Sequence, residues 1–466
     1  IPRRPHIMNN QKITFCTGVG TVTGANFLLE TPDGTKILID CGLVQGERVA
    51  EEENRGAFPY DPASIHALFV THAHLDHVGR IPRLVKEGFK GDIYSTPQTR
   101  DLARLVLEDA VGILAEEAKR ENKEPLYGLD DVQAIFPLWK TIGYHQAFRL
   151  NDKVSVFLKD AGHILGSSMF EFSLPSKVLF TGDLGNSPHP LLRDTEPAGD
   201  VDHIVMESTY GDRNHPPKSE RIGRLAVIVN EAMSRGGTLV IPAFSVDRAQ
   251  VLLYELNNLT KDKKIPPVPV FFDSPLAEKV TGVYRDSSDL FNDDAKAAIA
   301  KEGDIFAFPH LKFVESNRES KGIDRFNGAK IILAGSGMSV GGRVIGHEEH
   351  FLPDPKSTIL LVGYQAAGSL GRELANGASK VRIHGQTVKI AAKIETLYGY
   401  SAHKDSDHLV EFVSTAVGPG GKSRLKQVFV VMGEPGAEMH LAQRLNDELD
   451  AHAVVPERLK AYEIQA

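Results

Sequence analysis

Short apolar runs that end in a polar or small residue recur along the chain, and they constrain its fold more than any other feature. Each run stops at Gly, Asp, Ser or a similar residue and gives way to a segment with helical periodicity. This alternation is typical of an α/β protein. In such folds the loops after the strand ends carry ligand sites, so we look for function there. The runs are 37–39, 68–70, 178–180, 204–206, 239–241, 270–272, 331–333, 359–362 and 428–431.

The size and composition of the chain indicate an ordinary globular protein. Its 466 residues predict two or three domains, because a domain usually holds roughly 100 to 200 residues. No apolar stretch approaches the ~20 residues of a membrane span. The two cysteines, Cys16 and Cys41, lack the spacing of a zinc ribbon or redox motif, so we expect a reduced, cytoplasmic location. Residues 1–7, before Met8, have no signal-peptide core and are expected to be an expression remnant.

The formal net charge of −8 means that the field of the whole molecule would repel nucleic acid. Any site for a polyanion must therefore be local. The charge weighs only mildly against a nucleic-acid substrate, because bound divalent metals add positive charge that a residue count omits.

The segment THAHLDH (71–77) follows an apolar run and places four potential metal ligands in six positions. Imidazole nitrogens and carboxylate oxygens suit zinc and similar divalent ions. A lone histidine in such a loop would usually be a solvated polar side chain, but this density reverses the expectation. The sequence therefore predicts a metal site formed by His72, His74, Asp76 and His77 at the end of a strand.

Three further residues stand where they could complete this site. Asp40 closes the run KILI, His163 lies in DAGHILGS, and Asp183 follows the run VLF. For Asp40, direct ligation and a role in orienting a ligand are equally open. His163 and Asp183 are the stronger candidates for ligands.

The HxHxDH segment, the later histidine and the later aspartate resemble the metallo-β-lactamase superfamily over residues 13–190. That resemblance implies a first metal held by His72, His74 and His163. It implies a second metal held by Asp76 and His77, with Asp183 bridging both. A water held between two such metals loses its proton near neutral pH and becomes the nucleophile.

Several segments of the second half resemble the β-CASP branch of that superfamily, which consists of nucleic-acid-cleaving enzymes. The branch includes the endonuclease subunit of the pre-mRNA cleavage and polyadenylation machinery and its bacterial and archaeal relatives. The segments are ESTYGDR (207–213), PAFSVDRAQ (242–250), GSGMSVGGR (335–343), GYQAAGSLGR (363–372) and YSAHKD (400–405).

The resemblance implies an α/β fold in which a metallo-β-lactamase αβ/βα four-layer sandwich carries an inserted α/β β-CASP domain. We place the sandwich in residues 8–205 and 385–466, and the β-CASP domain in residues 206–384.

The same resemblance assigns three catalytic residues. Asp76 acts on the nucleophilic water, and His403 lies near the metals as general acid toward the leaving oxygen. Glu207 hydrogen-bonds His403 and keeps it oriented and protonated. Taken alone, His403 could equally be a surface histidine at a helix start.

A phosphate site is expected in the second half. Ser336 and Gly337 follow a predicted strand and precede a helical stretch, so backbone N–H groups there could hold a phosphate. Arg248 and Arg343 could pair with phosphates in bidentate fashion. A structural turn and solvated arginines are the ordinary alternatives.

The chain departs from the RNA-cleaving pattern at the third β-CASP motif, where a histidine is usual and Val431-Met432-Gly433-Glu434 stands instead. A thioether is a poor ligand for zinc, so we expect one tight zinc site and a second, weaker one. The nearby His440 receives no role. The DNA-repair members of the branch also carry an apolar residue at this motif. Glu207 and the GSGM and GYQ segments, however, resemble the RNA-cleaving members.

These features predict a zinc-dependent hydrolase, a ribonuclease that cleaves single-stranded RNA. The alternatives are a β-CASP DNA nuclease, a small-molecule hydrolase or lactamase, and a catalytically weakened RNA-binding subunit. The long resemblance of the second half opposes the lactamase, and the intact HxHxDH opposes the weakened subunit. Endonucleolytic and exonucleolytic cleavage both stay open, as does a homodimer, and we expect no membrane association.

Overall fold

The structure is a computed structural model that describes residues 11–45, 48–366, 368–417 and 420–464 of the chain. Residues 1–7, expected to be an expression remnant, lie outside the described residues. The chain forms two compact units. The first unit comprises Ile1–Ser187, Asp194–Asn214 and His403–Ala466, and the second comprises Pro188–Arg193 and His215–Ala402.

The first unit is built on two seven-stranded sheets. One sheet has the order β22-β1-β2-β3-β4-β5-β6, with β1 (Gln11–Thr17), β2 (Asn26–Glu30), β3 (Lys36–Ile39), β4 (Ala67–Phe69), β5 (Asp92–Ser95), β6 (Trp139–Thr141) and β22 (Ala461–Ile464). The other has the order β21-β20-β11-β10-β9-β8-β7, with β7 (Ala147–Arg149), β8 (Ser155–Asp160), β9 (Ser168–Ser173), β10 (Lys177–Phe180), β11 (His203–Glu207), β20 (Gln427–Val431) and β21 (Ala453–Val454).

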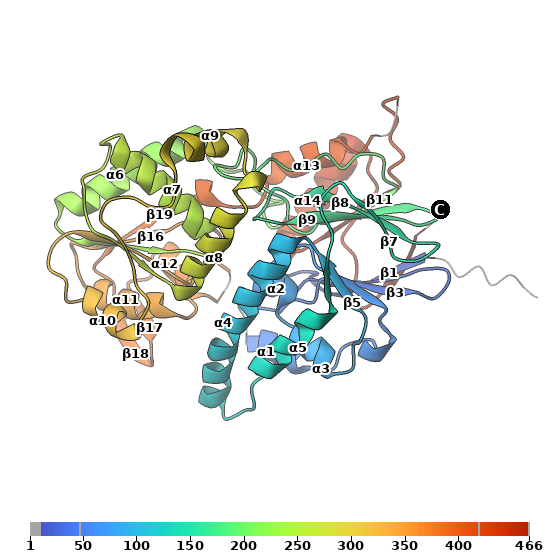
Figure 1. The fold of residues 1–466 in the computed structure, drawn as a ribbon, viewed down its shortest axis with the longest axis horizontal. Coiled ribbons are helices and arrows are strands. Elements are labelled where there is room, and N and C mark those ends of the chain that lie inside the picture. The colour runs from blue at the N-terminus through green and yellow to red at the C-terminus, as the bar shows by residue number, and fades with distance from the viewer. Residues whose placement is uncertain (1–10, 46–47, 367, 418–419, 465–466) are drawn as a thin grey trace, which may run out of the picture. The chain divides into compact units, whose positions relative to one another are not determined.

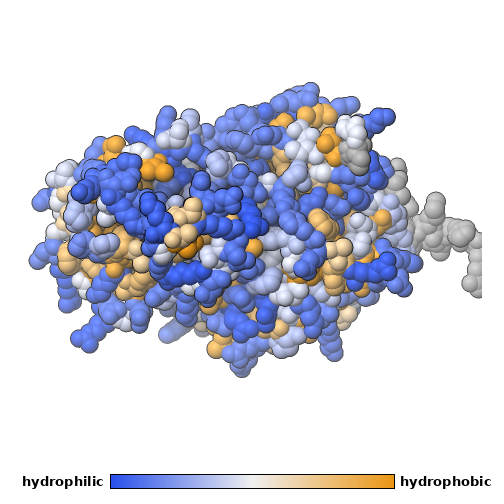
Figure 2. All heavy atoms as spheres, turned by 45° about the horizontal axis from the view of Figure 1, so that its top comes forward, coloured by the Kyte–Doolittle hydropathy of each residue, from blue (hydrophilic) through white to orange (hydrophobic). Residues whose placement is uncertain are grey.

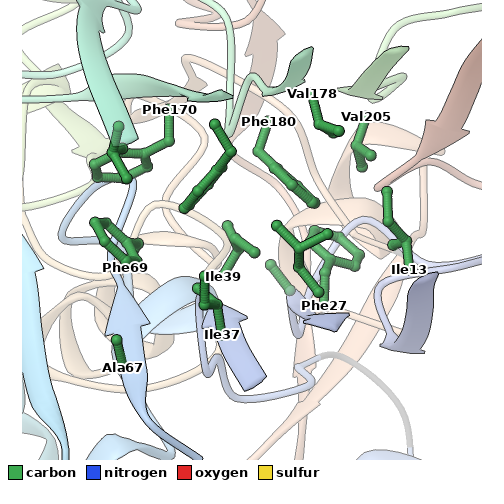
Figure 3. Close-up of a cluster of buried hydrophobic side chains, with 14 of the residues drawn as sticks. Ile13, Phe27, Ile37, Ile39, Ala67, Phe69, Phe170, Val178, Phe180 and Val205 are labelled. Carbon is green, nitrogen blue, oxygen red and sulfur yellow. The ribbon is translucent and has the colours of Figure 1, made fainter. Parts of the chain in front are cut away.

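The two sheets pack face to face around one apolar core. Figure 3 shows Ile39 and Phe69 of one sheet facing Phe170 and Phe180 of the other. The rings of Phe69 and Phe170 meet edge to face with centroids 5.3 Å apart, a favourable aromatic geometry. The inward-facing residues alternate with residues on the opposite face of each strand, as the two-residue period of a strand requires.

Helices cover the outer faces of both sheets (Figure 1). On the second sheet, α13 (Ser406–Ser414) and α14 (Pro435–Leu449) pack against the outward residues of β11 and β20 in a separate apolar cluster. On the first sheet side lie α1 (Arg48–Arg55), α2 (Leu75–Val78), α3 (Ile81–Lys86), α4 (Pro97–Glu121) and α5 (Leu129–Ile135). The four-layer order of helix, sheet, sheet and helix confirms the predicted sandwich.

The second unit holds a parallel six-stranded sheet with the order β14-β13-β15-β12-β16-β19. Its central strands are buried along their whole length, as is typical of a parallel sheet with helices on both faces. The strands are β12 (Thr238–Pro242), β13 (Val270–Asp273), β14 (Leu311–Phe313), β15 (Lys330–Ala334), β16 (Thr358–Leu361) and β19 (Lys393–Thr396). A separate hairpin consists of β17 (Lys380–Ile383) and β18 (Gln386–Lys389).

The α-helices in the described residues of this unit are α6 (Lys218–Ser234), α7 (Arg248–Lys261), α8 (Pro275–Asp286), α9 (Asp293–Glu302), α10 (Asn317–Ile323), α11 (Arg343–Phe351) and α12 (Leu370–Ala375). The compact unit reaches Ala402, further along the chain than the predicted boundary at 384. The reason is that β19 pairs with β16 and so belongs to the parallel sheet.

All nine apolar runs identified in the sequence coincide with strands, from β3 to β20. None of the helices in the described part of the chain has the length and apolar character needed to cross a bilayer. On the face drawn in Figure 2, hydrophobic side chains lie in small groups among hydrophilic ones. The large exposed ones come from separate segments and include Ile113, Phe326 and Met439.

Candidate metal centre

The candidate metal ligands of the first unit lie on loops that leave neighbouring strands. The HxHxDH segment begins just past β4 and runs into the short helix α2. Asp40 follows β3, which pairs with β4 in parallel. His163 lies between β8 and β9, and Asp183 follows β10. The carboxyl ends of parallel neighbours meet at one edge of a sheet, which brings residues distant in sequence together.

A first ligand group consists of His72, His74, His163 and Asp183, each of which offers one ligand atom within 4.8 Å of the others. The Nε2 atoms of His72 and His163 lie 3.4 Å and 3.6 Å from Asp183 Oδ2. His72, His163 and Asp183 are buried. Three imidazoles and one carboxylate around a single point form a donor set that zinc accepts in four-coordinate sites.

A second group adjoins the first through Asp183. His77 Nε2 lies 3.4 Å from Asp183 Oδ1 and 3.9 Å from Asp76 Oδ2. Both His77 Nε2 and Asp183 Oδ1 are buried and make no hydrogen bond. Buried polar atoms in a native fold are nearly always satisfied, and a divalent cation between these two would satisfy both. Asp183 thus turns one oxygen to each group, as a bridging ligand would.

Asp40 orients His77 rather than facing the ligand groups directly. Its Oδ2 accepts hydrogen bonds from His77 Nδ1 and Thr71 Oγ1, both at 2.8 Å, and its Oδ1 accepts from the Thr71 N–H at 2.8 Å. The hydrogen bond from Nδ1 to Asp40 fixes the ring so that Nε2 is directed toward Asp183 and Asp76. Of the two roles open for Asp40, the geometry favours orientation. Thr71, which no sequence motif singled out, completes this arrangement.

The charges of the cluster shift the pKa values of its members in opposite directions. Burial, reinforced by the neighbouring His77, holds the pKa of His72 well below its usual range, so His72 is neutral. Burial alone would raise the pKa of Asp183, but the charge of His77 outweighs burial and holds that pKa well below the ordinary value. A neutral imidazole and an ionised carboxylate are the forms that bind metals.

His403 and Glu207 form a pair beside Asp183. His403 Nδ1 lies 3.0 Å from Glu207 Oε2 and 3.1 Å from Oε1, and 3.9 Å from Asp183 Oδ2. Burial alone would lower the pKa of His403, but the charge and hydrogen bond of Glu207, followed by Asp183 and Asp76, raise it to about 9. An isolated bridge between Gly185 and His403 joins the two loops. The imidazole is therefore held and protonated next to the ligand groups.

Met432 lies in the apolar core and not among the ligands. Its side chain is buried with Phe27 and Val431 in the cluster between the sheets. Its sulfur packs so closely on Gly18 that a Cβ at position 18 would lie 2.8 Å from it. Met432 also lines a small cavity together with His77. The weaker second metal site stays a prediction.

His440, to which the sequence assigned no role, stabilises the turn at Gly211. Its Nδ1 donates to the Gly211 carbonyl oxygen at 2.9 Å from the exposed side of α14. A Cβ at Gly211 would lie 2.6 Å from the Ala437 oxygen, so this turn packs tightly on the helix.

The four candidate phosphate ligands all belong to the second unit, whereas the metal ligands belong to the first. Arg343 already donates to Asp273 Oδ1 at 2.7 Å and to the backbone oxygens of Val314 and Glu315, both at 2.8 Å. Arg248 is buried on α7.

The loop that carries Ser336 and Gly337 follows β15, as predicted. The Gly337 carbonyl oxygen accepts a hydrogen bond from Gln365 Nε2 at 3.0 Å, and a Cβ at this position would lie 2.4 Å from the Phe244 ring. Close packing therefore accounts for this glycine, and phosphate binding at the loop stays a prediction.

Three family models match successive parts of the chain. The metallo-beta-lactamase superfamily model matches residues 19–216, the Beta-Casp domain model matches residues 249–374, and the model of the Zn-dependent metallo-hydrolase RNA specificity domain matches residues 387–456. The first match contains both ligand groups and Glu207, and the third contains His403.

Curated proteins align with nearly the whole chain. The chain is 35% identical to Ribonuclease TTHA0252 of Thermus thermophilus, over 91% of this chain and 96% of that protein. It is 31% identical to Transcription termination factor FttA of Methanosarcina mazei, over 94% of this chain and 69% of that protein. A crystal structure of a protein of unknown function from Enterococcus faecalis V583 shares the fold, with a TM-score of 0.54, 12% identity, and coverage of 98% of this chain and 100% of that one.

Proposed function

The chain belongs to the β-CASP branch of the metallo-β-lactamase superfamily, and from that premise we propose that it is a zinc-dependent ribonuclease. Its reaction would be hydrolysis of phosphodiester bonds in single-stranded RNA. The observation that carries the proposal is the position of the His403–Glu207 pair, 3.9 Å from the carboxylate shared by the two ligand groups. Groups for activating water and for protonating a leaving oxygen thus lie together.

The residues present fit two divalent cations. His72, His74, His163 and Asp183 would hold the first zinc, and Asp76, His77 and Asp183 would hold a second, weaker one. When bound, zinc supplies Lewis-acid charge and lowers the pKa of a coordinated water toward neutrality.

Asp76 would accept the proton of the attacking water. Burial, reinforced by Asp183 and opposed by His77, raises the pKa of Asp76 to about 6. A carboxylate beside the attacking water is a group that can take its proton in general-base catalysis.

His403 would donate a proton to the leaving oxygen as the phosphorus–oxygen bond breaks. With its pKa raised to about 9 by Glu207, against the effect of burial, the imidazole carries this proton at neutral pH. Glu207 is itself fixed, since its Oε1 accepts the Leu184 N–H at 2.7 Å. The proton removed by Asp76 and the proton given by His403 balance across the reaction.

RNA is favoured over DNA as the substrate by the names of the relatives and by the description of the third family model. The test compares end-labelled single-stranded RNA with DNA of the same sequence, so that fragment lengths also distinguish internal from terminal cleavage. We expect cleavage of RNA, slower or absent cleavage of DNA, and bound zinc by elemental analysis.

Asp76→Ala should reduce the turnover of RNA roughly a thousandfold, about 4 kcal/mol of barrier, with little change in melting temperature. The matched control is Asp101→Ala, an exposed aspartate on α4 of the same unit, which should retain full activity. Near wild-type turnover in folded Asp76→Ala protein would contradict the assignment.

A further inference from the structure

The β17–β18 hairpin forms a two-stranded sheet of its own in the second unit, near α10 and α11 (Figure 1). Its register pairs Lys380 with Lys389, Val381 with Val388, and Arg382 with Thr387. Directly opposite residues of an antiparallel pair point to the same face, and the next pair points to the other. The hairpin therefore has two chemically distinct faces.

The inner face has a structural role. Val381, Ile383 and Val388 are buried and join the apolar cluster that includes Phe351 of α11 and Leu374 of α12. The fourth residue on this face, Gln386 opposite Ile383, is exposed. The burial of the three apolar residues fixes the register.

The outer face has no such explanation. Lys380, Arg382, Thr387 and Lys389 are all exposed on it. Two lysines directly opposite each other repel, which weakens strand pairing. Three cations gathered on one exposed face are suited to contact an external anion.

The protein itself supplies little counter-charge to this face. Within the described residues, Lys380, Arg382 and Lys389 make no ion pair within 4.0 Å. By contrast, the next lysine, Lys393, meets Glu231 and Glu395 at 2.7 Å each. The acid paired with the hairpin is Glu349, which lies 3.0 Å from His384 in the turn.

The local sequence strengthens the contrast. No aspartate or glutamate occurs between residues 374 and 394, although the chain as a whole carries a net charge of −8. The hairpin is thus a basic surface on an acidic protein, and its field acts over about one Debye length, ~10 Å at 0.1 M salt.

We propose that the outer face of the β17–β18 hairpin binds the sugar–phosphate backbone of single-stranded RNA. Lysine, arginine and threonine side chains are the groups that contact phosphates, and they read no base sequence. A protein partner fits less well, because protein interfaces need an apolar centre and the apolar side chains of this hairpin all point inward. The proposal rests on the proposed function for the identity of the ligand, but it involves none of the metal centre.

The test measures binding of a fluorescein-labelled single-stranded RNA of ~30 nucleotides by fluorescence anisotropy over a salt series. The protein carries Asp76→Ala throughout so that the RNA stays intact. The hairpin variant is Lys380→Gln, Arg382→Gln and Lys389→Gln. The control variant is Lys90→Gln, Arg120→Gln and Lys140→Gln, which removes the same two lysines and one arginine from exposed positions of the first unit.

Each phosphate contact on a single strand contributes about 0.7 to the slope of log affinity against log salt. The hairpin variant should therefore lose about 2 from this slope and bind on the order of a hundredfold more weakly at 0.1 M salt. The control should shift neither quantity by a comparable amount. With the catalytic residues intact, the hairpin variant should lose more activity toward this RNA than toward one of about five nucleotides.

Equal slopes and affinities for the hairpin and control variants would overturn the proposal, even if the wild type cleaves RNA. If the wild type binds RNA without cleaving it, the proposed ribonuclease function is wrong. The slope of log affinity against log salt for the hairpin variant then still decides whether the hairpin binds RNA. A melting temperature equal to that of the control shows that lost binding does not come from unfolding.

Discussion

Replacing Glu207 by glutamine tests the role of this carboxylate beside His403, the proposed general acid. Both carboxylate oxygens are engaged: Oε1 accepts the Leu184 N–H at 2.7 Å, Oε2 accepts the Thr209 N–H at 3.3 Å, and both lie within 3.1 Å of His403 Nδ1. Glutamine keeps the shape but removes the negative charge. It also turns an NH2 group toward one of these N–H donors, which should destabilise the fold by about 1 to 3 kcal/mol.

The expected size of the effect follows from the pKa of His403. Burial lowers this pKa, but Glu207 and the nearby aspartates raise it from 6.5 to about 9, a net change worth about 3 kcal/mol. Glu207 is the largest of the raising influences. If its loss lowers the pKa by about 2 units, the protonated fraction at pH 8 falls from ~0.9 to ~0.1, and turnover falls about tenfold.

The direction of the shift in the pH profile follows from the role of His403 as a proton donor. Activity is present below the pKa of the acid and is lost as pH rises through it, so the alkaline limb of kcat should move to lower pH in the variant. Bound cations would lower the pKa in both proteins, so the prediction concerns the difference between the two profiles.

The assay is the pH dependence of kcat on saturating RNA, with melting temperatures measured in parallel. Glu438→Gln is the matched control, because Glu438 is equally buried in the first unit and accepts the Gly20 N–H at 2.8 Å. It should lose stability without moving the alkaline limb. An unchanged limb in Glu207→Gln would refute the role of this pair in protonating the leaving oxygen.

Two further predictions concern residues outside this pair. Met432→His should raise the zinc content after dialysis, because position 432 lines a cavity with His77. It should also lower the melting temperature of the zinc-free protein, since an imidazole replaces a thioether in the core at a cost of about 1 to 3 kcal/mol. Unchanged zinc content would reject position 432 as a vacated ligand site. In the second unit, hydrogen bonds from His347 to Asp273 and Asp324 outweigh burial and raise the His347 pKa to about 9. Its contribution to stability, up to about 3 kcal/mol, should be complete below pH 6.5 and lost as pH rises through 9, and denaturant unfolding of His347→Asn should show a flatter pH dependence over this range.

The amino-acid sequence was enough to predict the buried strands and the candidate metal ligands. A central strand appears in the sequence as an apolar run, since both of its faces are buried. Each of the nine apolar runs coincides with a strand. The HxHxDH segment is equally local, because its ligands lie within one turn past β4. Short strands such as β7 and β17 were missed, because half of their residues face solvent and leave no continuous apolar signal.

Contacts between side chains that are distant in sequence could be found only in the folded protein. Glu207 and His403 are 196 residues apart in sequence, and resemblance, not pattern, had paired them. In the structure Asp40 also contacts His77, and Arg343 donates to Asp273. The sequence alone could not distinguish an arginine with such an internal partner from a phosphate ligand. The reason is physical: periodicity records whether a side chain is buried, whereas its partner depends on strand order and loop path, which long-range packing sets.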